Sequence, residues 1–149
     1  MNLAIKITLL ASGIFLLIGM LLGIIKYRKI MTSATHQAPV YIDIAHRASL
    51  LYSFAALVMA KLLEYNSFSL KTQLWISCVP LFFFAVTIAQ YARLGFENNT
   101  ENQFAERNFT TTWGMYLLII GEIGGVALIL WGFCGNAVAQ TVKNQIWKI

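Results

Sequence analysis

The stretch "WGMYLLIIGEIGGVALILWGF" (residues 113–133) decides the fold of this chain, because it is long and apolar enough to cross a membrane as one helix. At about 1.5 Å per residue, such a helix covers the roughly 30 Å hydrocarbon core of a bilayer. Three further apolar runs occupy residues 3–25, 44–65 and 74–96. The sequence therefore predicts an all-α protein, an integral membrane bundle of four transmembrane helices. We expect residues 1–149 to form one transmembrane domain with a short polar C-terminal tail.

The composition supports a membrane protein and excludes a nucleic-acid partner. Hydrophobic residues make up 58% of the 149 residues and charged residues only 11%, unlike a soluble domain. The net charge of +5 comes from basic residues scattered over loops and helix ends, whereas nucleic-acid binding requires a clustered basic surface. The expected partner is the lipid bilayer, and the expected location is the bacterial inner membrane.

The basic cluster "KYRK" (residues 26–29) follows the first apolar run directly. Because no small-residue cleavage site follows this run, it predicts a retained helix rather than a secretory signal. Short basic loops favour the cytoplasmic side, so the cluster favours cytoplasmic first and third loops with both termini on the other side. Cys78 and Cys134 form neither a metal-spaced pair nor a disulfide framework.

Small residues recur at the spacing that lets membrane helices approach closely. They form the pairs Gly19 and Gly23 in the first helix and Gly121 and Gly125 in the fourth, and the stripe Ser49, Ser53, Ala56 and Ala60 in the second. These contacts could join subunits or the helices of one bundle, and the sequence leaves both readings open.

Glu122 is the residue whose position in the sequence points most strongly to a function. It lies about nine residues into the fourth helix, close to the bilayer midplane. An ionised carboxylate there costs at least about 2.5 kcal/mol, so such residues usually face a protein interior and serve a function. The alternative is a protonated Glu122 that only hydrogen-bonds a neighbouring helix.

The second helix begins with "YIDIAHRASLLYSF" (residues 41–54), which gathers Asp43, His46 and Arg47 on one side of the helix. Asp43 could orient the His46 ring. Arg47 could reach the membrane surface or pair with an anionic group of a ligand. The plainer alternatives are a histidine satisfied inside the bundle and an arginine that only anchors the helix at the interface.

Polar groups of the third helix are expected near the same end of the bundle. The segment "AQYARLG" (residues 89–95) supplies Gln90 and Tyr91, which should converge with the second and fourth helices above Glu122. A single histidine without a companion ligand fits a zinc site poorly and fits haem better, because haem brings its own equatorial nitrogens. We expect the haem slot on the His46 side of the second helix, where Ser49 and Ser53 are small.

The segment "IAHRASLLYSFAALVMA" (residues 44–60) resembles the start of the second helix in styrene oxide isomerases and the related hydroxylaminobenzene mutases, which are small four-helix membrane isomerases. Residues 113–133 are similar in character to their last helix. The resemblance implies a homotrimer with haem b between subunits and His46 as the axial ligand of the iron. It also implies a redox-neutral rearrangement of a small apolar substrate such as an epoxide. The chain departs from the family at Tyr52, where asparagine is usual, so substrate positioning stays open.

These observations predict a membrane-embedded haem-binding isomerase. His46 and Arg47 are expected to bind the cofactor, with His46 on the metal. Gln90, Tyr91 and Glu122 are expected to shape a catalytic pocket. One alternative is a non-enzymatic haem or electron-transfer subunit. The other is a small transport or accessory protein that uses Glu122 as a proton or cation site.

Overall fold

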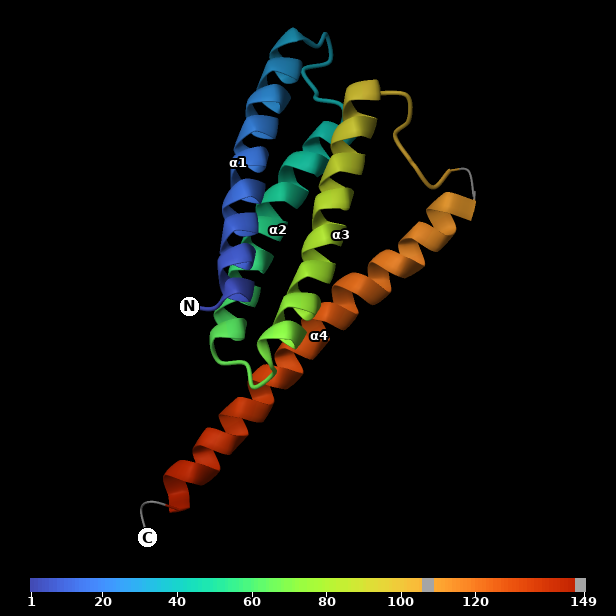
Figure 1. The fold of residues 1–149 in the computed structure, drawn as a ribbon. Coiled ribbons are helices and arrows are strands. Elements are labelled where there is room, and N and C mark those ends of the chain that lie inside the picture. Colours follow the sequence, from blue (N-terminus) through green and yellow to red (C-terminus); the bar gives the residue numbers. More distant parts are fainter. Residues whose placement is uncertain (106–108, 147–149) are drawn as a thin grey trace.

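The computed structural model describes the backbone of residues 1–105 and 109–146, and the side chains of residues 1–105 and 111–138. Within these residues the chain is all-helical, which confirms the predicted secondary-structure class (Figure 1). The four helices are α1 (Leu3–Thr32), α2 (Val40–Glu64), α3 (Leu70–Glu97) and α4 (Phe109–Ile146). Each is long and apolar enough to cross a membrane.

The helices extend beyond the predicted apolar runs. α1 continues through the "KYRK" cluster to Thr32, and the backbone of α4 continues to Ile146 through the segment expected to be a polar tail. Hydropathy marks only the apolar part of a helix, and polar residues can prolong it because the backbone hydrogen bonds are made within the helix. Pro39 stands at the start of α2, and Asn98 ends α3 with a left-handed φ of 48°.

The first three helices pack side by side (Figure 1). One face of α2 is buried along its whole length, and it carries Ile42, Ala45, Ser49, Ser53, Ala56, Ala60 and Leu63. On α1, a Cβ at Gly19 would lie 2.7 Å from Leu50 Cδ2, and one at Gly23 would lie 3.0 Å from His46 Cε1. The small residues of α1 and α2 are therefore used for contacts within one chain.

The last helix, α4, crosses α3 obliquely and diverges from it toward its own N-terminus (Figure 1). The two helices approach at the predicted glycine pair. A Cβ at Gly121 would collide with the ring of Phe83, and one at Gly125 would lie 2.7 Å from Pro80 Cδ. This pair also serves a contact within the chain. The N-terminal half of α4 is left with large exposed apolar side chains.

The connection between α2 and α3 holds α4 at the opposite end. The Asn66 side-chain amide donates to the Ile129 carbonyl at 3.0 Å. The backbone N–H and the hydroxyl of Ser67 both donate to the Gly132 carbonyl, at 3.1 and 3.0 Å. As a result, α4 is fixed near this connection and stands apart from α3 near loop three, whose described part is residues 98–105. We call that part of the molecule the loop-three end.

Candidate functional site

His46 lies at the contact between α1 and α2. Its Nδ1 is 2.8 Å from the carbonyl oxygen of Gly19, and its ring covers Gly23. Because a carbonyl oxygen can only accept, Nδ1 donates this bond, and in a neutral imidazole Nε2 then carries the lone pair. Among the described residues, Nε2 has no hydrogen-bond partner.

The acidic neighbour of His46 does not orient the imidazole ring as expected. Asp43 instead forms two ion pairs, one with Lys26 of α1 at 2.5 Å and one with Arg47 at 2.8 Å. The reason is geometric, because α1 extends as a helix far enough to bring Lys26 beside Asp43. Arg47 is largely exposed and is engaged by Asp43, so its charge belongs to a local network.

The slot expected for haem beside Ser49 and Ser53 is filled by α1. Ser49 is fully buried and lies against Gly19, and the backbone carbonyl of Ser53 accepts a hydrogen bond from Ser12 at 2.9 Å. His46 offers a nitrogen that suits haem iron. Because α1 packs against this face of α2, a single chain leaves no room there for the porphyrin. Any haem on His46 would need a second subunit.

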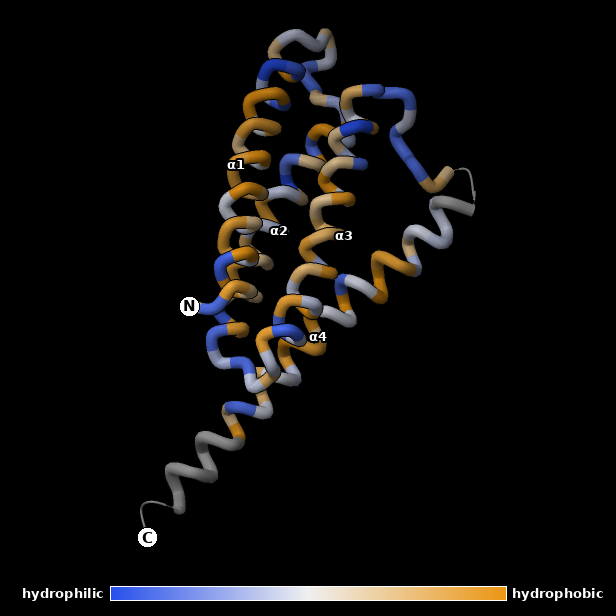
Figure 2. Tube along the Cα trace, viewed as in Figure 1, coloured by the Kyte–Doolittle hydropathy of each residue, from blue (hydrophilic) through white to orange (hydrophobic). Residues whose placement is uncertain are grey.

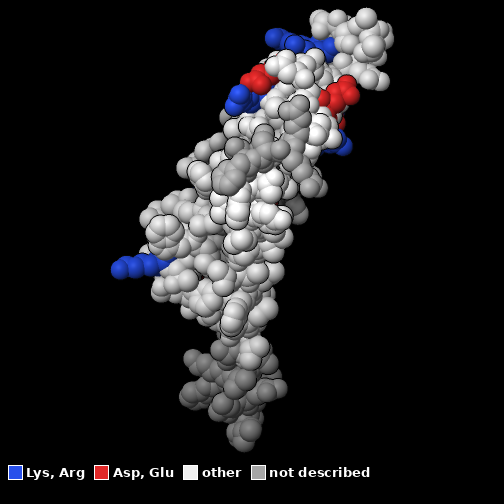
Figure 3. Space-filling view, turned by 90° about the vertical axis from the view of Figure 1, so that its right-hand side faces the viewer, with Lys and Arg blue, Asp and Glu red and all other residues white. Residues whose placement is uncertain are grey.

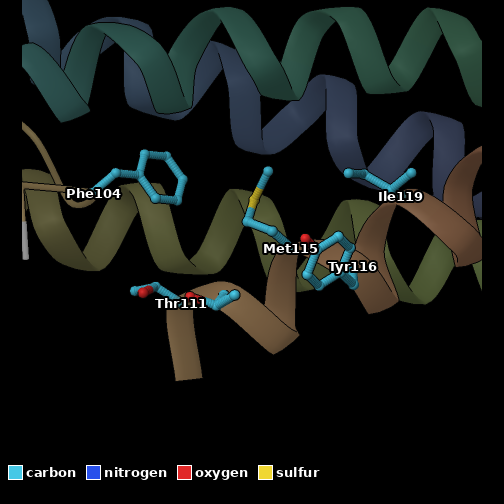
Figure 4. A pocket seen from close by; sticks show the side chains of 6 residues that line it. Phe104, Thr111, Met115, Tyr116 and Ile119 are labelled. Atoms are coloured by element: carbon cyan, nitrogen blue, oxygen red, sulfur yellow. The ribbon is translucent and has the colours of Figure 1, made fainter. Parts of the chain in front are cut away.

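Polar residues gather instead around a cavity between α3 and the diverging half of α4. The cavity measures about 310 Å³. Its walls are formed by Phe83, Val86, Thr87, Gln90 and Tyr91 of α3, by Gln103 and Phe104 of loop three, and by Thr111, Gly114, Met115, Leu117 and Leu118 of α4. Figure 4 shows an adjoining hollow of about 510 Å³, whose lining includes Phe104, Thr111 and Met115 again. The predicted pocket residues Gln90 and Tyr91 thus share one cavity.

Glu122 is not among the residues that line this cavity; it lies one helical turn beyond Leu118, which does line it, and next to the point where α3 and α4 meet. The hydroxyl of Tyr52 on α2 donates to Glu122 Oε1 at 3.4 Å. The Tyr52 ring stacks on Phe84 of α3, with centroids 4.1 Å apart. The hydrogen bond joins α4 to α2, and the stacked rings join α2 to α3 at the same place.

Thr87 is the one described residue that has a buried side-chain oxygen without a hydrogen-bond partner. It is 6% exposed, lines the cavity and lies beside the Tyr52 hydroxyl. A threonine in a membrane helix usually satisfies its hydroxyl on a carbonyl of the preceding turn. The Thr87 hydroxyl does not, so it remains available to something in the cavity.

The predicted site residues fall into two groups on opposite sides of α2. His46 and Arg47 belong to the α1 side, whereas Gln90, Tyr91 and Glu122 belong to the α3–α4 side. Sequence reasoning missed Tyr52 and Thr87 as members of the second group. Tyr52 could have been placed by helical rotation, since six residues turn a helix by about 240° and carry Tyr52 away from the His46 face.

Within the described residues, no cluster of three or more histidine, cysteine, aspartate or glutamate side chains is arranged to hold a metal ion. Cys78 is partly buried and Cys134 is exposed, and both are free thiols.

The comparisons add no relative. No family model, no curated protein and no solved structure matched the chain. The likeness to the styrene oxide isomerases therefore rests on the residues quoted above.

Proposed function

We propose that the chain is an integral membrane protein. Hydrophobic residues run along all four helices (Figure 2). Many of their side chains lie on the outer surface, including Leu17, Leu51, Phe82 and Ile120, each more than half exposed. In the face drawn in Figure 3, charged side chains gather at one end, and basic atoms also project from the flank below. An apolar flank with charge at the helix ends suits a bilayer.

The four antiparallel spans imply that both termini lie on the same side of the membrane. Tags fused to each terminus should therefore be equally accessible to an impermeant protease in sealed vesicles of one orientation. Opposite accessibility of the two tags would overturn the four-span topology.

The α3–α4 cavity, in this proposal, binds a small and largely apolar molecule that carries an oxygen atom. The observation that carries this proposal is the unpartnered hydroxyl of Thr87. A buried hydroxyl without a hydrogen bond costs roughly 1–3 kcal/mol, and a ligand oxygen in the cavity would recover that cost. The other walls are mostly apolar, and the additional polar residues are Gln90, Tyr91, Gln103 and Thr111.

The chemistry that we propose is a redox-neutral rearrangement, with an epoxide as the substrate class suggested by the family resemblance. A neutral carboxyl at Glu122 can protonate the ring oxygen as one C–O bond breaks. A hydrogen then migrates with its electron pair to the adjacent carbon, and the resulting protonated carbonyl returns its proton to the carboxylate. The atoms and electrons balance without an external donor, and Tyr52 holds the carboxyl group in place.

Turnover of a small epoxide by purified protein, without an electron donor, tests this mechanism. We expect wild-type protein to form the carbonyl isomer and Glu122→Gln to lose about 100-fold or more in rate, the usual scale for a general acid. Glu64→Gln is the matched control, because Glu64 pairs with exposed Lys61 and lies outside the cavity. Absence of turnover in wild-type protein, or equal loss in both variants, would overturn the isomerase proposal.

A haem-dependent function is the second candidate, and one observation favours it. The bond from Nδ1 to the Gly19 carbonyl fixes the His46 tautomer and leaves Nε2 as a possible axial ligand, an arrangement common for metal-binding histidines. Arg47 would then meet the propionates, and the porphyrin would lie between subunits of the homotrimer.

Purified protein made with ample haem tests this candidate by its Soret absorbance. His46→Ala should abolish the band, whereas His36→Ala should retain it, because His36 lies in the exposed connection between α1 and α2. A folded preparation without a Soret band would overturn the haem proposal and leave the cavity proposal intact.

A further inference from the structure

A line of hydroxyl groups leads from Glu122 toward the loop-three end. It starts at Tyr52, which donates to the carboxyl group, and continues with the adjacent Thr87 hydroxyl. Tyr91 follows on the cavity wall, within electrostatic range of both Glu122 and Tyr41. The Tyr41 and Tyr91 rings are stacked with centroids 6.0 Å apart.

The outer end of the line lies at loop three. The hydroxyl oxygen of Tyr41 accepts a hydrogen bond from the backbone N–H of Gln103 at 2.7 Å. That bond occupies a lone pair but leaves the Tyr41 proton free to be donated. Residues 101 and 102 beside it are exposed, so this end of the line is next to water if the helices span a membrane.

The cavity supplies the space between these groups. Its roughly 310 Å³ can hold several water molecules, because one water occupies about 30 Å³ in the liquid. A stable water needs two or more polar partners. Thr87, Gln90 and Tyr91 offer such partners on one wall.

We propose that Tyr41, Tyr91, Thr87 and Tyr52, together with cavity water, form a proton relay that connects Glu122 to the solvent at the loop-three end. Each hydroxyl accepts a proton on one side and releases its own on the other, so a proton passes without net charge remaining on any intermediate group. The relay sets the charge of Glu122 from one face of the membrane only. It deepens the proposed function, which requires a neutral Glu122, but it does not require any substrate.

Hydrogen–deuterium exchange of the Glu122 carboxyl group tests the relay. Protonated carboxyl groups absorb in a separate infrared region, and the band moves to lower frequency in heavy water. Among the other described acidic residues, Asp43, Glu64 and Glu97 form ion pairs and Glu101 is exposed. Loss of the band in Glu122→Gln assigns it to Glu122.

After transfer of detergent-purified protein to heavy water, Tyr91→Phe and Thr87→Val should each slow the shift of this band by about tenfold, the change expected when one hydrogen bond of the path is lost. Tyr116→Phe is the matched control, because Tyr116 lies on the same helix as Glu122 but half exposed and lining only the adjoining hollow. Equal helical content of all variants by circular dichroism excludes misfolding.

An unchanged exchange rate in Tyr91→Phe and Thr87→Val would overturn the relay, as would a wild-type band that Glu122→Gln retains. Equal slowing in Tyr116→Phe would overturn it as well, because the effect would then not follow the path. The measurement contains no substrate, so a failed relay leaves epoxide turnover untouched, and a failed turnover assay leaves the exchange result standing.

Discussion

The contact between α1 and α2 and the contact between α3 and α4 both depend on a pair of glycines. They differ in whether the polar groups nearby have hydrogen-bond partners. Each begins with two glycines four residues apart that let a neighbouring helix approach closely. Between α1 and α2 the approach continues along the helices, and the polar groups there find partners: His46 reaches the Gly19 carbonyl and Ser12 reaches the Ser53 carbonyl. Between α3 and α4 the approach ends at Gly121, and beyond it Thr87 has a buried hydroxyl without a partner.

This difference helps to distinguish polar groups that stabilise the fold from polar groups that are candidates for binding a ligand. A polar group that already has a partner in the fold explains its own presence, and this applies to His46 as a bond between helices. A polar group without a partner, beside a cavity, needs another explanation. The α1 side of α2, which carries His46 and the likeness to the isomerase family, therefore has its hydrogen bonds satisfied. The α3–α4 side is the better candidate for binding a ligand.

A substitution at the glycine contact of α4 should have the largest effect on stability. Gly125→Leu should lower stability by about 1–3 kcal/mol, because its side chain would meet Pro80 and the Ile76 carbonyl. Gly124→Leu, the neighbouring position, should be almost neutral, since a Cβ there has nothing within 4 Å. Thermal unfolding in detergent measures both. Equal destabilisation by the two variants would contradict the described orientation of α4.

The histidine bond on the other side of α2 should matter less. His46→Ala removes a hydrogen bond and a ring that covers Gly23, so we expect a loss of about 1–2 kcal/mol in unfolding free energy. Ligand affinity in the α3–α4 cavity should not change, because His46 lies on the α1 side of α2. If His46→Ala lost ligand affinity in the cavity but kept its stability, the two regions would not be independent.

A pair of hydroxyl deletions compares the two regions directly. Ser12→Ala should destabilise the protein by about 0.5–1 kcal/mol, because it removes a satisfied bond to Ser53. Thr87→Val should instead raise stability by up to about 1 kcal/mol, because it removes an unpartnered buried hydroxyl.

The same Thr87→Val variant should weaken binding of a small epoxide by about fivefold to tenfold, the loss expected for one hydrogen bond. Equilibrium binding and thermal unfolding on the same preparations provide both numbers. If Thr87→Val destabilises the protein as Ser12→Ala does, the Thr87 hydroxyl has a partner in the fold and the cavity loses its main support.

The smallest effect is expected at the ion network of Asp43. Asp43→Asn removes the attraction to Lys26 and Arg47, but these side chains are partly or largely exposed, so solvent screens the pairs. We expect a loss well under about 1 kcal/mol, which disappears as salt is added. Unfolding measured at low and high salt checks this, and a large loss independent of salt would indicate that Asp43 has another role.

Much of the fold was predictable because hydropathy and helix length are local properties. The four apolar runs gave the number and order of the helices, and Pro39 marked the start of α2. The ends were less accurate, because a polar segment such as "KYRK" can extend a helix without changing its hydropathy signal. Small-residue spacing identified the close contacts, but only the structure assigned them to one chain.

The site was predictable in part for the same reason. Helix position placed Gln90 and Tyr91 at one end of the bundle, where they line the cavity, and Glu122 deeper along α4, where it lies outside that lining. Rotation about the helix axis was harder, because it depends on which neighbour each face meets. That is why the sequence does not show that His46 faces α1, does not assign Tyr52 to the Glu122 side of α2, and does not single out Thr87.

In the membrane location proposed above, the length of α4 links the cavity to the bilayer. Its apolar part, Thr111–Val138, contains 28 residues, which at about 1.5 Å each exceeds a hydrocarbon core of about 30 Å. Such a helix tilts to match the bilayer, and the glycine contacts and hydrogen bonds described here hold α4 between Gly121 and Asn136. A thicker bilayer should reduce the tilt of α4 and narrow the cavity. Ligand affinity should therefore change with the acyl-chain length of the lipid. Epoxide binding in vesicles of short-chain and long-chain phosphatidylcholine would measure it, and equal affinity in both would show that the α3–α4 angle is rigid.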